Sequence, residues 1–141
     1  MIKCFGVGQT LLNKMKIEFS DIELRALVRA LTFVRFECKE NEARFLAGSP
    51  HVAEIYKRVT EATGEYYRSK NIPFPDEWQS IESINGYLDI IKIRIKDTDN
   101  WKDLEPSQRY SFLNTLVYPY KISENTLIEL IRYGDEIHSR S

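Results

Sequence analysis

From Ser20 onward, apolar residues recur at the three- and four-residue spacing of an amphipathic helix. The first run begins at a helix start signal, because Ser20 precedes Glu23 by the spacing of a capping box. We predict a long first helix from Asp21 to Ala47, ended by Gly48. Its apolar stripe consists of Leu24, Leu27, Val28, Leu31, Val34 and Cys38.

A second helical pattern starts directly after Gly48. Ser49 is a suitable N-cap, and Pro50 suits the first helical turn, where the amide that proline lacks has no partner. Because the connection is so short, we expect the first two helices to pack as an antiparallel hairpin. The pattern ends before Pro73 and Pro75, which cannot lie inside a helix.

The segment from Trp78 to Lys96 carries two conflicting patterns. A helical stripe runs through most of it and consists of Trp78, Ile81, Ile84, Leu88, Ile91 and Ile95. Against one continuous helix, Asn85-Gly86 is a turn signal, and residues 91–96 alternate as a strand does. The stripe covers more residues than the alternation does. We therefore predict a helix and keep a strand near residues 87–96 as the alternative.

Two more helices follow a polar connector. Pro106 suits the first turn of one, which ends near Pro119, and Ser123 caps the other. These patterns predict an all-α fold, a compact helical bundle of about five helices, with an α+β fold as the alternative. We expect a single helical domain over residues 15–141 after a flexible leader or arm at residues 1–14, and Met15 is a second possible start of the chain.

The stretch GVGQTLLNKM, from Gly6 to Met15, looks like the start of a phosphate-binding loop. Such a loop has the pattern G-x-x-x-x-G-K-[ST], in which backbone amides surround the phosphates and the lysine balances their charge. With Gly8 as the second glycine, the first glycine position holds Lys3 and the lysine position holds Gln9. We therefore predict no nucleotide site in this stretch.

The chain offers few groups for catalysis or metal binding. It has two histidines and two cysteines, Cys4 and Cys38, which lack the CxxC spacing of zinc and redox sites. His51 and Glu54 share one helix face, but no second copy of the pair completes a metal site. No serine lies in a G-x-S-x-G elbow. We predict no catalytic residue, no metal and no cofactor, and we do not expect an enzyme.

The charge balance and the hydropathy of the chain limit the classes of partner that it is expected to bind. Twenty Lys and Arg residues against twenty-one Asp and Glu residues give a net charge of -1, which disfavours a dedicated polyanion binder. No stretch approaches the roughly eighteen apolar residues that a membrane span needs, and the N-terminal stretch lacks the apolar core of a signal peptide. We expect a cytoplasmic protein without membrane contact.

Tyrosines are the most distinctive surplus, eight among 141 residues. Tyr118 and Tyr120 bracket Pro119 at a predicted helix end, where aromatic residues either anchor an interface or cap the core. The isoleucine-rich stripe is likewise either core or a self-association seam. The candidate interface residues are Trp101, Tyr118, Tyr120, Ile81, Leu88, Ile91 and Ile95. The sequence predicts a non-enzymatic interaction or regulatory module that binds another protein or a second copy of itself.

A nucleic-acid-associated protein is the alternative. Its candidate contacts are the basic residues Arg25, Arg29, Lys92, Arg94 and Lys96. Glutamates dilute the charge of the first helix, and Asp97 and Asp99 directly follow the second cluster. Nucleic-acid binding is therefore the less favoured of the two hypotheses.

Overall fold

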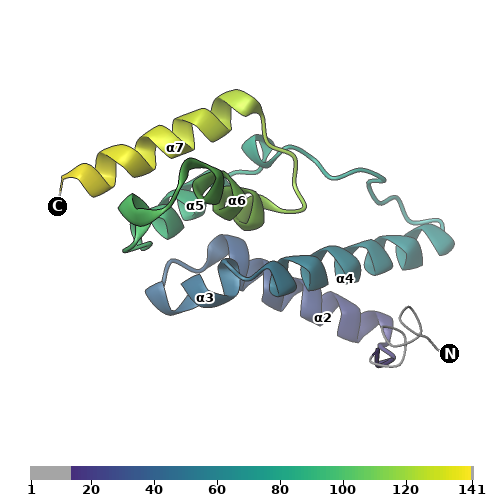
Figure 1. Ribbon diagram of the computed structural model, residues 1–141. Helices are drawn as coiled ribbons and strands as arrows, with labels where there is room; N and C mark the ends of the chain where they lie inside the picture. The colour runs from purple at the N-terminus through teal and green to yellow at the C-terminus, as the bar shows by residue number, and fades with distance from the viewer. Residues whose placement is uncertain (1–13, 141) are drawn as a thin grey trace, which may run out of the picture.

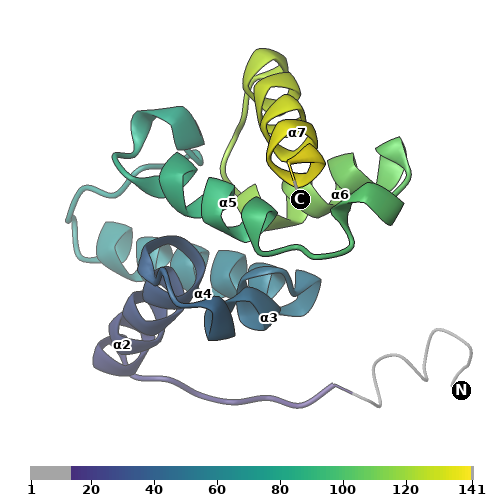
Figure 2. The same ribbon diagram turned by 90° about the vertical axis from the view of Figure 1, so that its left-hand side faces the viewer.

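The structure is a computed structural model that describes residues 14–140, and these residues form an all-α fold, as predicted. The helices before Lys70 form one layer, and the helices after Gly86 form the other (Figures 1 and 2). The helices are α2 (Asp21–Thr32), α3 (Arg44–Ala47), α4 (Pro50–Ser69), α5 (Tyr87–Lys96), α6 (Pro106–Val117) and α7 (Glu124–Ser139). The predicted leader lies outside the described residues except for Lys14.

The predicted helix starts are confirmed by local hydrogen bonds. Ser20 accepts from the Glu23 amide at 3.2 Å, and the Glu23 carboxylate accepts from the Ser20 amide at 2.9 Å, which completes the capping box. Ser49 and Ser123 each accept from the amide three residues later. α2 and α4 pack against each other and run in roughly opposite directions, as predicted (Figure 1), but the chain that joins them runs from Phe33 to Ser49 and is not the short connection from which the hairpin was predicted.

The predicted first helix from Asp21 to Ala47 is too long. The α-helix ends at Thr32, a π-helical turn covers Phe33–Glu37, and the backbone is extended at Cys38 and Glu40. A short 3₁₀ turn and α3 then lead to Gly48. The cause lies far along the chain, because the Arg94 guanidinium of α5 donates to the carbonyls of Cys38 and Glu40. Tertiary contacts thus override a continuous helical pattern here.

The predicted continuous helix over Trp78 to Lys96 is also wrong at its start. A 3₁₀ turn covers Ile81–Ser83, and the turn signal at Asn85-Gly86 is real, because Gly86 adopts a positive φ of 88° directly before α5. Such a backbone conformation favours glycine. The alternative of a strand near residues 87–96 is wrong as well, since this segment is α5. Within residues 14–140 the only β contact is an isolated bridge between Ser80 and Lys121.

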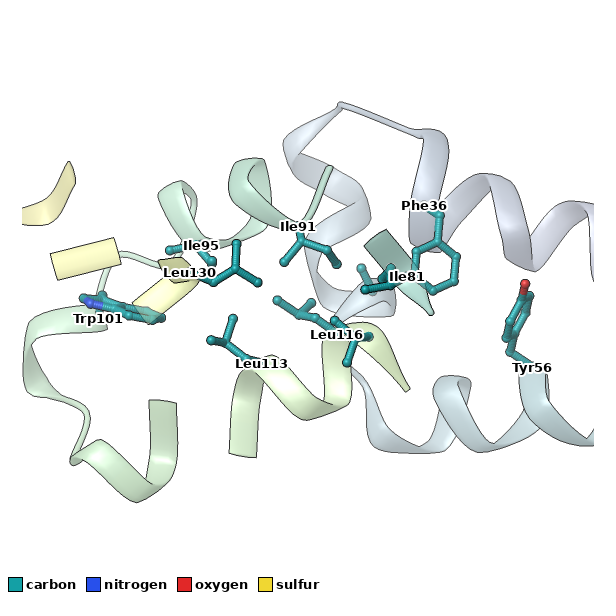
Figure 3. Close-up of a cluster of buried hydrophobic side chains, with 11 residues drawn as sticks. Phe36, Tyr56, Ile81, Ile91, Ile95, Trp101, Leu113, Leu116 and Leu130 are labelled. Carbon is teal, nitrogen blue, oxygen red and sulfur yellow. The ribbon is translucent and has the colours of Figure 1, made fainter. Parts of the chain in front are cut away.

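One hydrophobic core joins the two layers. Figure 3 shows Trp101 at one end of this cluster and Phe36 and Tyr56 at the other, with side chains of α5, α6 and α7 between them. Trp101 packs directly against α7, where a Cβ on Gly134 would lie 2.4 Å from the indole ring. No helix within residues 14–140 combines the length and the apolar character needed to cross a bilayer.

Candidate binding site at the Tyr118–Tyr120 turn

The turn Tyr118-Pro119-Tyr120 follows directly on the C-terminus of α6. Its Tyr118–Pro119 peptide bond is cis, and the Tyr120 amide donates to the Val117 carbonyl at 2.9 Å. Tyr118 is 36% exposed, whereas Tyr120 is half-buried. The two tyrosines, which the sequence singles out as interface candidates, therefore differ in their surroundings.

A buried arginine holds this turn in place. Arg35 donates to the carbonyls of Tyr118 at 2.6 Å and Thr115 at 2.9 Å, and its guanidinium lies 4.7 Å from the centre of the Phe36 ring. Burial lowers the pKa of Arg35 to about 10. Because this value is still above neutral pH, the side chain keeps its charge there. Within residues 14–140 no carboxylate pairs with it, and the carbonyl end of α6 supplies the compensating negative dipole.

Tyr120 belongs to a cluster of aromatic side chains. Its hydroxyl lies 2.6 Å from the Tyr56 hydroxyl, and its ring meets Trp78 edge-on with the ring centres 5.1 Å apart. Phe36 and Tyr87 stack with their ring centres 4.6 Å apart and both contact Tyr120. Burial and the Tyr56 hydrogen bond raise the pKa of Tyr120, so the phenol stays neutral. The cluster therefore serves as a rigid uncharged wall.

Beside Tyr118, a groove of about 530 Å³ lies between α4 and α6. The Tyr118 hydroxyl donates to Glu54 at 2.9 Å, and this hydrogen bond raises the pKa of the phenol. Glu54 is the one charged residue among those lining the groove, which are Pro50, Ala53, Glu54, Ser107, Tyr110, Ser111, Asn114, Thr115 and Tyr118. Hydroxyl and amide groups of this kind suit hydrogen bonds to a peptide backbone.

Beside Tyr120, a smaller pocket of about 170 Å³ lies between α4 and the segment that follows the two prolines. Three aromatic rings, three carboxylates, one guanidinium and a hydroxyl surround it. The lining residues are Thr60, Glu61, Arg68, Phe74, Pro75, Asp76, Glu77, Trp78, Gln79 and Tyr120. The Trp78 indole N–H donates to Glu61 at 3.0 Å and thereby fixes one wall.

The groove and the pocket use the same face of α4. Ala53 and Glu54 line the groove, and Thr60 and Glu61, each seven residues further on, line the pocket. Seven residues are about two helical turns, or roughly 10 Å along the helix axis. The turn places Tyr118 and Tyr120 on the walls of the two hollows. The groove and the pocket thus lie one after the other along α4.

Most of the candidate interface residues are not available to a partner in this fold. Trp101, Ile81, Ile91 and Ile95 are each 0% exposed, and Leu88 is half-buried against the core. Their apolar stripe is therefore core, the alternative that the sequence left open. Of the seven candidates, the two tyrosines of the turn line the groove and the pocket.

One of the candidate nucleic-acid contacts, Arg94, is buried in the fold. Arg94 is 1% exposed and donates to backbone carbonyls of the segment after the π-helical turn, so it cannot reach a phosphate. Arg25, Arg29, Lys92 and Lys96 are exposed. Arg25 pairs with Asp21 of its own helix, and the Lys92 ammonium lies 5.6 Å from the Tyr133 ring centre in α7.

Sequence reasoning missed the polar residues of the pocket. Thr60 and Glu61 look like ordinary solvated positions of a long helix, and only their meeting with Trp78 gives them a site. The sequence feature that could have revealed this site is the pair of prolines before Trp78. Proline cannot continue a helix, so the chain has to turn away from the axis of α4 there. Comparison with protein-family models, with curated proteins and with solved structures finds no match for this chain. Its function must therefore be inferred from its own residues.

Proposed function

We propose that this protein is a non-enzymatic recognition module that binds an extended segment of another protein along α4. One observation carries the proposal: the Tyr118–Tyr120 turn contributes one aromatic wall to each of two hollows on the same helix face. Extended chain advances about 3.3 Å per residue, so three residues cover the spacing between the hollows and a short segment fills both. The expected location is the cytoplasm.

The chemistry of the groove supports a peptide occupant. A bound strand exposes N–H and C=O groups that need partners, and the groove offers Ser107, Ser111 and Asn114 for them. Tyr118 adds a large ring whose hydroxyl is already oriented by Glu54, which limits the entropy lost on binding. A groove that combines an aromatic wall with a few hydrogen-bonding groups is typical of specific recognition.

The experiment is a selection of random displayed peptides on the immobilised protein, followed by fluorescence polarisation of the enriched peptides. Ser111 is exposed and lines the groove, so Ser111→Trp fills the groove without touching the core. We expect this variant to weaken binding about tenfold or more. Glu129→Trp, at an exposed position of α7 outside the hollows, is the matched control and should bind as the parent does.

A failure to enrich any peptide, or equal binding by Ser111→Trp and the parent, would contradict the proposal. Light scattering on the eluting protein distinguishes a second copy as the occupant. In that case the parent and Glu129→Trp are dimers and Ser111→Trp is a monomer, and the partner is the chain itself.

A further inference from the structure

Thr60 differs from three other threonines within helices of this fold. Thr32, Thr63 and Thr115 each donate to the carbonyl four residues earlier, at 2.7, 2.8 and 3.1 Å. The Thr60 hydroxyl is buried and has no hydrogen-bond partner within residues 14–140. A buried hydroxyl without a partner is costly, and Thr60 lines the pocket beside Tyr120. Thr60 thus brings to the pocket wall a hydroxyl whose hydrogen-bonding capacity no described residue uses.

The walls of this pocket suit a cation. Phe74, Trp78 and Tyr120 contribute aromatic rings, whose faces carry negative charge density and attract ammonium groups. Trp78 is held by its hydrogen bond to Glu61, and Tyr120 by its hydrogen bond to Tyr56. The rings of Trp78 and Tyr120 are therefore placed before any ligand arrives.

The residues that line the pocket carry more negative than positive charge. Three carboxylates line it against one guanidinium: Glu61, Asp76 and Glu77 against Arg68. Each carboxylate has a neighbouring cation, with Lys57 4.0 Å from Glu61, Arg68 3.4 Å from Asp76 and Lys121 3.1 Å from Glu77. These pairs are exposed, and exposed ion pairs are weak. An incoming cation can therefore share their carboxylates.

From the ring walls, the carboxylates and the unpartnered hydroxyl, we infer that this pocket binds an alkylammonium group, the end of a lysine side chain. The ammonium donates to the Thr60 hydroxyl and faces Glu61, while the alkyl stem lies against Trp78 and Tyr120. A cavity of roughly 150 Å³ holds a benzene molecule, so a pocket of about 170 Å³ accommodates this group. The identity of the cation as a lysine of the bound segment rests on the proposed function.

The test uses n-butylammonium as the probe, with 1-butanol and butyrate as neutral and anionic controls of matched length. Amide and indole N–H resonances of the whole chain are followed by NMR during each titration. We expect n-butylammonium to shift the Thr60, Glu61 and Trp78 signals. The expected dissociation constant is about 1 to 10 mM, because a ligand of so few atoms makes few contacts. The two controls should bind at least about fivefold more weakly than n-butylammonium. Equal binding of all three probes, or no binding of n-butylammonium, overturns the inference.

Two variants separate the hydroxyl from the charge. Thr60→Val keeps the shape of the side chain, and Glu61→Gln keeps an acceptor for the Trp78 indole while removing the carboxylate. We expect each to weaken n-butylammonium binding about threefold or more. Glu65→Gln, one turn further along α4 and outside the pocket, should leave binding unchanged. Parent-like binding by both pocket variants overturns the inference.

The two proposals fail in different ways. If selected peptides bind the groove but carry no basic residue, and n-butylammonium does not bind, the results contradict the cation site and support the recognition function. If n-butylammonium binds and no peptide is enriched, the recognition function falls and the cation site stands.

Discussion

α2 has a strong amphipathic pattern, and yet its residues are far less buried than those of the core around α5 to α7. None of the twelve residues of α2 is buried, and its Ile22 is 66% exposed. Trp101 and Leu113, by contrast, are 0% exposed. α2 packs along α4 on one side, whereas the core residues are enclosed by several elements. A helical stripe therefore predicts which side packs, and the number of neighbours decides how deeply.

The starts of α2 and α7 show the same difference. Ser20 and Glu23 close the capping box of α2 within three residues. At α7, the Ser123 amide donates to Glu82 at 3.0 Å, a carboxylate 41 residues earlier in the chain. α2 thus begins through local contacts alone, and the start of α7 combines a local cap with a contact made by the assembled fold.

The largest expected effect is the contrast between Trp101→Ala and Leu27→Ala. Truncation of the fully buried Trp101 should lower the free energy of unfolding by about 3 to 5 kcal/mol, because it leaves a large cavity. Leu27 in α2 is half-buried, so its truncation should cost about 1 to 2 kcal/mol. Urea titrations followed by circular dichroism measure both values. Equal losses would mean that α2 is as well enclosed as the core.

A smaller effect should distinguish two helical glycines. Gly134→Ala places a methyl group 2.4 Å from the buried Trp101 ring, and the resulting overpacking should cost about 1 to 3 kcal/mol. Gly64→Ala meets Phe74 at 2.6 Å, but Phe74 lies in a connecting segment and is half-buried, so it can shift.

The gain in helix propensity, about 1 kcal/mol, should then leave Gly64→Ala near the stability of the parent. Thermal unfolding of the two variants side by side measures the difference. A stable Gly134→Ala protein would show that Trp101 is less firmly held than its burial indicates.

The smallest expected effect concerns the start of α7. Partial burial raises the pKa of Glu82, but hydrogen bonds from Ser80, Thr126 and Ser123 outweigh it and lower the pKa from 4.5 to about 2. Because the folded state binds this proton less readily than the unfolded state, Glu82 stabilises the fold above pH 4.5. That contribution is lost as the pH falls towards 2.

Glu82→Gln should therefore be slightly less stable than the parent at neutral pH and lose less stability between pH 4.5 and 2. Melting temperatures measured across this range test the difference in slope. Glu129→Gln removes an exposed carboxylate of α7 without touching its start and serves as the control for net charge. Parallel curves for Glu82→Gln and the parent would refute a role of Glu82 at the start of α7.

The fold class could be predicted because its signals are local. Ser20, Ser49, Pro106 and Ser123 each start a helix through groups within three or four residues, and the structure has helices at these positions. The site could be predicted only in part. The Tyr118–Tyr120 turn stands out in the sequence, but Thr60 becomes distinctive only through its missing partner in the folded chain.

The sequence by itself thus determined the helical class, most helix starts and the breaks at its prolines, because capping and backbone restriction act between near neighbours. Only the tertiary structure decided where the first helix ends. Arg94 donates hydrogen bonds to the carbonyls of Cys38 and Glu40, which lie 56 and 54 residues earlier in the chain. The tertiary structure also decided that the stripe with Ile91 and Ile95 is core and that Tyr118 remains exposed. Burial depends on which elements meet, and sequence periodicity does not carry that information.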